Sequence, residues 1–229
     1  MWLELFLCLM LAHLVADFVL QSNKVCKDKA EKKWKCWYHY AHALIVCGLA
    51  WLVSWSWDFL WCALVIGVTH FAIDMWKSYR EENVTLFAVD QMLHIAMMAG
   101  VAWMWCSMND WSMPVDVALY YVAMTIAIIV CWKPSNIFIK LMLKHYSVNM
   151  PEEKAGGFNA GVLIGDIERW LILAFVLMQH YEALGLLIAA KSIIRFSEKD
   201  TEKTEYVLAG TLMSIFIAVL AGMMVMMVE

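Results

Sequence analysis

The strongest constraint on this chain is a series of long apolar segments that recur along its 229 residues. Eight such segments are present, at residues 2–21, 41–57, 59–76, 85–106, 114–132, 159–179, 183–196 and 205–228. A helix that crosses a bilayer needs about 20 mainly apolar residues, and the seventh segment is the shortest of the series. The sequence therefore predicts an all-α, polytopic transmembrane helix bundle of about eight spans.

Composition supports a membrane protein and excludes other classes. Hydrophobic residues make up 63% of the chain and charged residues 17%, whereas soluble domains are nearly half apolar and about a quarter charged. The net charge of −4 gives no global basic signal for a polyanion, so we expect the lipid bilayer as a partner and no nucleic acid. The seven Cys form no CxxC pair, which indicates free thiols rather than a disulfide scaffold.

The basic residues predict the orientation of the spans. If the spans alternate, 16 of the 17 Lys and Arg fall on one side, which the positive-inside rule assigns to the cytoplasm. Both termini are then extracytoplasmic. The chain divides into a five-helix N-terminal half at 1–132, a cytoplasmic loop at 133–158 and a three-helix C-terminal half at 159–229. The lysine-rich segment 24–35 is interpreted as a further, solvated inner loop.

Paired His and Asp side chains lie inside the first four apolar segments, although ionisable groups in hydrocarbon are costly and usually mark a functional site. Two pairs follow the pattern HxxxD, one pair reverses it, and the second segment is entered through His39 and His42, which are spaced i,i+3. The candidate ligands are His13, Asp17, His42, His70, Asp74, Asp90 and His94. Residues four apart share one face of a helix, and the predicted topology places all seven at a similar depth in the cytoplasmic half.

This donor set predicts a metal centre. Imidazole and carboxylate together suit Zn, Mn or Fe(II), so we expect one or two divalent ions, with some of the residues orienting the ligands rather than binding. An Asp that stays off the metal, Asp17 or Asp90, would serve as general base. The alternatives are hydrogen bonding between helices, a proton relay and haem ligation.

A second polar cluster lies in the C-terminal half. Arg169 is the one basic residue well inside an apolar segment, and we expect it to pair with Glu168 or Asp166. Together with Lys191 and Arg195 it could clamp a phosphate or another anion. The alternative is a structural ion pair, with the other two residues extending from helix ends to the membrane surface.

Several sequence blocks carry a resemblance to a known family. They are HLVADFVLQ (13–21), THFAIDMWK (69–77), DQMLH (90–94), AGVLIGDIERW (160–170), AAKSIIRF (189–196) and EYVLAGTL (205–212). Together they resemble a bacterial family of multi-pass membrane proteins that is a domain of unknown function. The HxxxD and DxxxH pairs are also similar to those of bacterial inner-membrane proteins described as metal-dependent hydrolases. The resemblance implies a multi-pass protein of the bacterial inner membrane.

The sequence thus favours an intramembrane, metal-dependent hydrolase with a cytoplasm-facing site and a phosphate-bearing or lipid-like substrate. Metal ions would lower the pKa of a bound water and so provide the nucleophile. Two other functions stay open: a transporter or channel for a metal ion or proton, and a non-catalytic membrane scaffold or sensor with a structural metal. A continuous polar path to the outer face would favour the transporter, and a closed four-ligand site would favour the scaffold.

Overall fold

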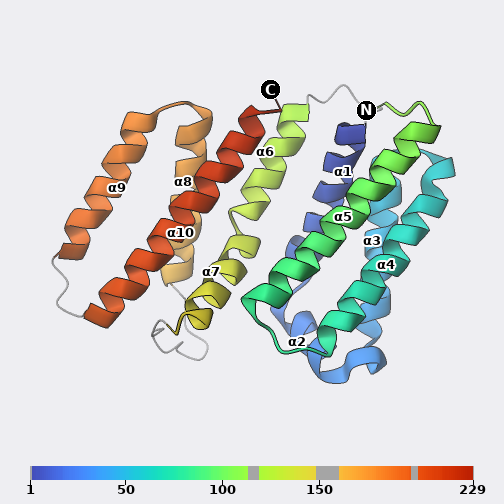
Figure 1. Cartoon of the computed structure of the whole chain (residues 1–229), viewed down its shortest axis with the longest axis horizontal. Coiled ribbons are helices and arrows are strands. Elements are labelled where there is room, and N and C mark those ends of the chain that lie inside the picture. Colours follow the sequence, from blue (N-terminus) through green and yellow to red (C-terminus); the bar gives the residue numbers. More distant parts are fainter. Residues whose placement is uncertain (1, 113–118, 148–159, 197–200, 229) are drawn as a thin grey trace. The chain divides into compact units, whose positions relative to one another are not determined.

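The computed structural model is entirely helical over the residues that it describes, which are 2–112, 119–147, 160–196 and 201–228 (Figure 1). The chain forms two compact units, Met1–Val122 and Ala123–Glu229. The boundary between these units falls within helix α6 (Leu119–Val130), whereas the sequence placed the division of the membrane protein after residue 132.

Several helices have the length and polarity of membrane spans. Within the described parts of the chain, four qualify on their own, namely Trp2–Leu20, Trp57–Ser78, Val84–Met108 and Glu205–Met226. The number rises to six if each of two bent helix pairs is one span, one pair bent by 109° and the other by 40°. Large apolar side chains such as Leu44, Val68 and Met92 point outward, as they would in lipid. These features indicate a membrane-embedded protein, and the count of eight spans stays a prediction.

The first unit is a bundle of four helices. They are α1 (Trp2–Leu14), which continues into a π-helix (Val15–Leu20), α3 (Trp37–Ser54), α4 (Leu60–Ser78) and α5 (Val84–Met108). Helices α1 and α4 each pack against both α3 and α5, so the four close a ring. A short 3-10 helix, Trp57–Phe59, joins α3 to α4.

An apolar core and one glycine hold these helices together. Leu5, Leu9, Phe59 and Met98 are almost completely buried in the core of this bundle. Gly67 allows α4 to approach α3 closely, because a Cβ atom at this position would lie 2.9 Å from Cys47 Cβ. Small residues of this kind are what membrane helices use to approach one another. The close approach fixes the register between α3 and α4.

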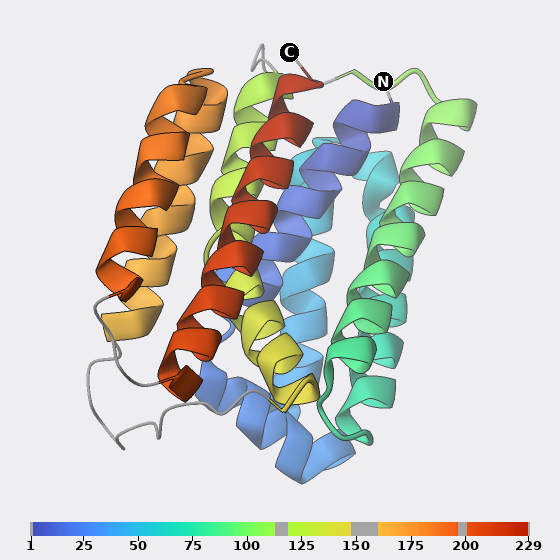
Figure 2. The ribbon, with the colours of Figure 1, turned by 60° about the vertical axis from the view of Figure 1, so that its left-hand side comes forward.

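Helix α2 (Asn23–Lys32) lies across one end of the bundle and contacts α3 and α4 (Figures 1 and 2). The prediction that 24–35 is a loop was wrong: α2 is followed by a 3-10 helix over Lys33–Lys35. The Ser22 hydroxyl caps α2 by accepting a hydrogen bond from the Val25 backbone N–H at 3.4 Å. Lysine is itself a good helix former, so the charge run does not prevent a helix.

The second unit contains the rest of α6, α7 (Lys133–His145), α8 (Ala160–Leu177), α9 (Tyr181–Phe196) and α10 (Thr201–Met226). Helix α10 packs against α7 and α8, and α8 packs against α9.

Helix α7 corrects the prediction that 133–158 is a loop. Pro134 lies in the first turn of α7, where its missing N–H costs no hydrogen bond. Ile139, Leu141 and Leu143 are buried, so this segment packs although its lysines are charged. The remainder of the predicted loop, from 148 on, lies outside the described residues.

Candidate metal centre

The structure brings together the seven His and Asp residues that the sequence singled out. They come from α1 and its π-helix, α3, α4 and α5, toward the end of the bundle that α2 covers (Figure 1). His70 and His94 are completely buried, and their ring centroids are 4.2 Å apart. The His13 ring stacks on His94 at 4.9 Å. Four helices therefore present their polar groups to one small volume.

Three donor atoms lie at the spacing of ligands around a single ion. His42 Nε2 is 3.0 Å from His70 Nε2 and 3.1 Å from Asp17 Oδ1, and His70 Nε2 is 3.4 Å from the same oxygen. In a tetrahedral site with bonds near 2.0–2.1 Å, ligand atoms are separated by about 3.3 Å. Asp74 Oδ2 lies 3.9 Å from His42 Nε2 and 3.8 Å from His70 Nε2, as a fourth donor.

A second group of donors shares Asp74 with the first. Asp74, Asp90 and His94 each offer a ligand atom, and these atoms lie within 4.8 Å of one another. His13, Asp17 and His70 form a further overlapping group, in which His13 Nδ1 is 3.6 Å from Asp17 Oδ1. Overlap through Asp74 is the arrangement that a carboxylate bridging two ions would have.

His94 is fixed in the state that a metal ligand requires. Its Nδ1 is 2.8 Å from the backbone carbonyl oxygen of Asp90. A carbonyl oxygen only accepts, so Nδ1 carries a proton, and in the neutral ring the lone pair is then on Nε2. Metal-binding histidines are commonly oriented by such a hydrogen bond from the other ring nitrogen.

In the donor group formed by Asp74, Asp90 and His94, two buried atoms lack a hydrogen-bond partner. His94 Nε2 and Asp90 Oδ1 are both buried, and neither makes a hydrogen bond within the described part of the chain. Buried polar atoms are nearly always satisfied, and an unsatisfied acceptor calls for an explanation such as an ion. The donor set and these two acceptors fit a divalent metal.

A π-helix carries Asp17. The segment Val15–Leu20 begins two residues after His13 and adopts the wider i→i+5 turn. Such turns are rare and are frequent at functional sites. The i,i+4 spacing of His13 and Asp17 predicted a shared α-helical face, and no signal in the sequence announced the change of helix type.

Two lysines that the sequence analysis did not place in the site reach it. Lys29 of α2 forms an ion pair with Asp74, and Lys77 Nζ donates to Asp90 Oδ2 at 2.7 Å. Lys77 follows Asp74 by three residues on α4, which was a usable signal. Lys29 belongs to a run of lysines that look alike in the sequence.

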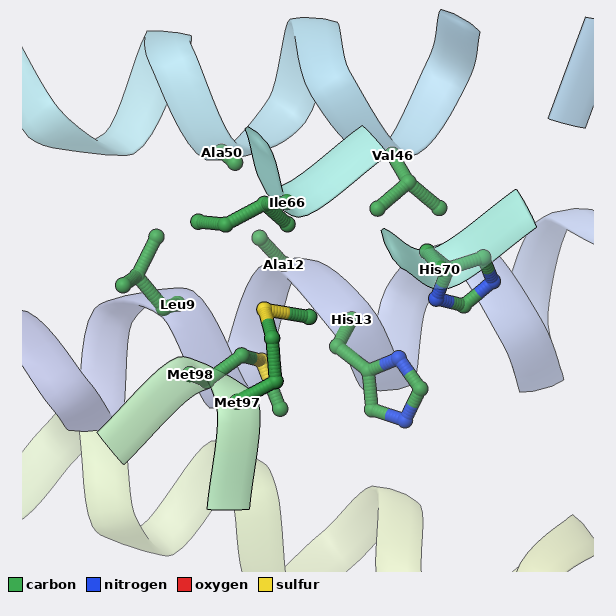
Figure 3. Close-up of a pocket in the computed structure, with 9 residues that line it drawn as sticks. All are labelled: Leu9, Ala12, His13, Val46, Ala50, Ile66, His70, Met97 and Met98. Atoms are coloured by element: carbon green, nitrogen blue, oxygen red, sulfur yellow. The ribbon is translucent and has the colours of Figure 1, made fainter. Parts of the chain in front are cut away.

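A small cavity adjoins the cluster on its apolar side (Figure 3). His13 and His70 form its polar end, and the rest of its wall is apolar: Leu9, Ala12, Val46, Ala50, Ile66, Met97 and Met98. His39, which also opens α3, is buried but packs edge-on against Phe71 and belongs to none of the donor groups found among the described residues.

The second predicted cluster has a different character. Arg169 is 1% exposed, and each of its three nitrogens donates a hydrogen bond. The acceptors are Cys131 O at 2.6 Å, Ser214 Oγ at 3.1 Å, and Asn136 Oδ1 and Asp166 Oδ1, both at 2.6 Å. Of the two partners that the sequence proposed, Asp166 pairs with Arg169, whereas Glu168 pairs with Lys191.

These contacts favour a structural role for Arg169. The anion clamp of Arg169, Lys191 and Arg195 stays a prediction. Arg169 ties α8 to α7, α10 and the end of α6 within the second unit. Gly165 makes room for its guanidinium group, since a Cβ there would lie 3.3 Å from Arg169 Nη1. Arg195, the third member of the predicted clamp, has a side chain outside the described residues.

Comparison with protein families identifies the first unit. The chain belongs to the family described as "Protein of unknown function (DUF3307)", which matches residues 5–122, just over half of the chain. The matched range contains all seven His and Asp residues of the candidate metal centre. The predicted resemblance to an uncharacterised family is confirmed to this extent. The blocks beyond residue 122 lie outside the match, and the bacterial origin and the likeness to hydrolases stay predictions.

No curated protein and no solved structure matches the chain.

Proposed function

We propose that the protein is an intramembrane metal-dependent hydrolase that acts on a phosphate-bearing or lipid-like substrate. The observation that carries the proposal is the sharing of Asp74 between two donor groups. One group combines this carboxylate with His42 and His70, and the other combines it with Asp90 and His94. Pairs of divalent ions bridged in this way are typical of enzymes that hydrolyse phosphate and peptide bonds.

The proposed metal ligands form two overlapping sets. Asp17, His42, His70 and Asp74 would hold one ion, and Asp74, Asp90 and His94 would hold a second. Zn, Mn or Fe(II) suits these ligands, and such an ion lowers the pKa of a water molecule toward neutrality so that it can act as a nucleophile. His13 lies 3.6 Å from Asp17 and would orient that carboxylate.

A general base completes the proposed site. Asp17 and Asp90 are the candidates, because each carboxylate has a second oxygen that can accept a proton while the first binds or orients. Asp90 Oδ2 accepts hydrogen bonds from Lys77 Nζ and Gln91 Nε2, at 2.7 and 3.0 Å. These contacts would hold the Asp90 carboxylate in one orientation, which efficient proton transfer requires.

The apolar core argues against the transporter alternative. Beyond His13 and His70, the cavity wall and the neighbouring core are apolar, with Leu5, Leu9 and Phe59 almost completely buried. A metal ion or proton crossing the membrane needs a chain of polar groups, and the wall of this cavity offers none beyond His13 and His70. The donor groups gather near one end of the bundle, as expected for a hydrolase whose site opens to one side of the membrane.

The topology proposed with this function has eight spans, both termini outside the cytoplasm, and a location in the bacterial inner membrane. A topology reporter inserted in the segment 24–35 should report the cytoplasm, and one fused after Glu229 the opposite side. A cytoplasmic signal from the C-terminal fusion would show that one predicted span, with 183–196 the first suspect, does not cross.

Phosphate release by the purified protein tests the function. We expect detergent-solubilised protein to hydrolyse phosphate esters, including phosphatidic acid, after reconstitution with Zn or Mn, and to stop when a chelator removes the metal. Asp90→Asn should lower the rate by about 100-fold or more, as loss of a general base does. Asp28→Asn, a half-buried carboxylate on α2 that belongs to none of the donor groups, is the control. Metal-independent release, or equal rates in both variants, would refute the proposal.

A further inference from the structure

Lys29 and Lys77 place two ammonium groups on the carboxylates of the candidate metal centre. Lys29 is 7% exposed, although α2 is otherwise a highly charged helix whose Lys24, Lys27 and Lys32 are exposed. Its ammonium group reaches Asp74, while Lys77 reaches Asp90 from α4. Both carboxylates belong to the group completed by His94, whose donor atoms lie within 4.8 Å of one another. The two ammonium groups therefore approach the same small volume.

The charges of the cluster determine what a metal-loaded site would attract. With neutral histidines, the three carboxylates and two ammonium groups sum to a net charge of −1. One divalent ion changes this sum to +1, and two ions change it to +3. Excess positive charge in apolar surroundings is costly unless an anion compensates it. A metal-loaded site of this composition thus has a place for an anion with charge of one or more.

We propose that the metal-loaded centre binds a phosphate group, and that Lys29 and Lys77 are its anion-binding residues. The inference rests on the proposed metal centre and names the substrate class for it. A phosphate offers several oxygens, so that it can contact an ion and two ammonium groups at once. Lysine suits this task as a compact point charge with three donors on a flexible stem. Lys77 keeps 34% of its side chain exposed, so an anion can reach it from outside.

Two sources can supply such a phosphate group, a soluble ester or a lipid head group. Helix α2, which carries Lys29, lies across the end of the bundle (Figure 2). Trp34 and Trp37 are exposed beside it, and Lys33 lies over the ring of Tyr79. Exposed tryptophans next to lysines are typical of the membrane surface, which is the depth of lipid phosphates. The chemistry of the two sources is the same, and the experiment distinguishes them.

The test measures the binding of inorganic phosphate to the purified chain by calorimetry, before and after loading with Zn or Mn. Metal content is determined on the same samples. We expect loaded wild type to bind phosphate, and Lys29→Met and Lys77→Met each to weaken that binding by about 10-fold or more, because each removes a charged hydrogen-bond donor. Both variants should keep their metal.

Lys32→Met is the matched control. Lys32 lies on the same helix and has an ion pair of its own, with Asp28 at 2.9 Å, whose hydrogen bond raises the pKa of the Lys32 ammonium group. It is exposed and outside the cluster. Its loss should change phosphate affinity by less than about 2-fold, as expected for a surface pair. Lys29→Arg keeps the charge and should retain phosphate binding, which separates the effect of charge from that of folding.

Each outcome is decisive. Wild type that binds metal but not phosphate overturns this inference and leaves the metal centre intact, whereas wild type without metal overturns both. Unchanged phosphate affinity in Lys29→Met and Lys77→Met also overturns it, and so does joint loss of metal and phosphate in both. Competition by phosphatidic acid in nanodiscs, against phosphatidylcholine alone, supports a lipid head group, and phosphate binding without such competition supports a soluble ester.

Discussion

The two units of this protein both bury charged side chains, but they satisfy them differently. In the second unit, Arg169 donates from every nitrogen to a carbonyl, a hydroxyl, an amide and a carboxylate. In the first unit, His94 Nε2 and Asp90 Oδ1 are buried without a hydrogen bond in the described part of the chain. His42 and His70 face each other nitrogen to nitrogen at 3.0 Å.

The difference distinguishes a structural hydrogen-bond network, such as that of Arg169, from a ligand-binding site. A buried charge whose hydrogen bonds are complete needs no further ligand, and loss of one partner destabilises the fold because the other charge is left unpaired. Buried acceptors that converge without donors leave a free-energy cost, which a bound cation would remove. Ionisable residues in apolar helices are therefore a common starting point for both roles, and their hydrogen-bond partners distinguish them.

The largest effect is expected for the shared carboxylate. Asp74→Asn should lower bound metal by about 10-fold or more, since even the partners of metal ligands contribute 10- to 100-fold to affinity. Asp166→Asn, the matched change in the second unit, should leave metal content unchanged. Elemental analysis of both purified variants makes the comparison. Equal metal content in the two would remove the distinction between the units.

Removing Arg169 should lower the stability of the fold rather than the metal content. Arg169→Met leaves Asp166 buried without its cation, and breaking a buried pair in this way costs roughly 3–5 kcal/mol. Thermal unfolding in detergent should therefore occur at a much lower temperature, while the metal content of the folded fraction stays at the wild-type value. Loss of hydrolysis by Arg169→Lys with normal unfolding would instead support the anion clamp.

A smaller effect is expected where α3 and α4 meet. Gly67→Ala would place a Cβ 2.9 Å from Cys47 Cβ, and overpacking of this kind costs about 1–3 kcal/mol. It should also weaken metal binding, because the same contact aligns His42 with His70. Gly48→Ala is the control on α3, where no atom lies within 4 Å of the added carbon. Comparable unfolding temperatures for both variants would argue against a close approach.

The smallest effect is expected for the histidine outside the donor groups. His39 lies three residues before His42 on α3 and packs against Phe71. His39→Phe keeps this contact and should leave metal content unchanged. A clear loss of metal in this variant would mean that the site extends further along α3.

Spacing alone could predict much of the candidate site. The i,i+4 pairs around His70 and His94, together with alternating spans, predicted donors at one depth in the membrane. The structure brings these side chains close together, and their depth in the membrane stays a prediction. Hydropathy likewise predicted the helices of the bundle. In a helix, the spacing of residues along the sequence determines which side chains share a face, so such patterns predict where the side chains lie.

Other features had no such signal. Lys29 has the same chemistry as Lys24 and Lys27, and only the packing of α2 on α3 and α4 decides which lysine is buried. The residues of Val15–Leu20, which include Asp17, carry no pattern that distinguishes a π-helix from an α-helix. Helix α7 was missed because charge and Pro134 obscured its amphipathic pattern. Arg169 was expected to pair with Glu168 or Asp166, and the structure selects Asp166. Its remaining acceptors come from distant segments.

The central claim is that the first unit binds divalent metal through these histidines and aspartates. The most direct measurement is the metal content of the purified chain after reconstitution, for wild type, His94→Ala and His39→Ala side by side. We predict one or two ions per chain in wild type and in His39→Ala, with a sharp fall in His94→Ala. Wild type that retains no Zn, Mn or Fe above the buffer blank, or His94→Ala with full occupancy, would contradict the account.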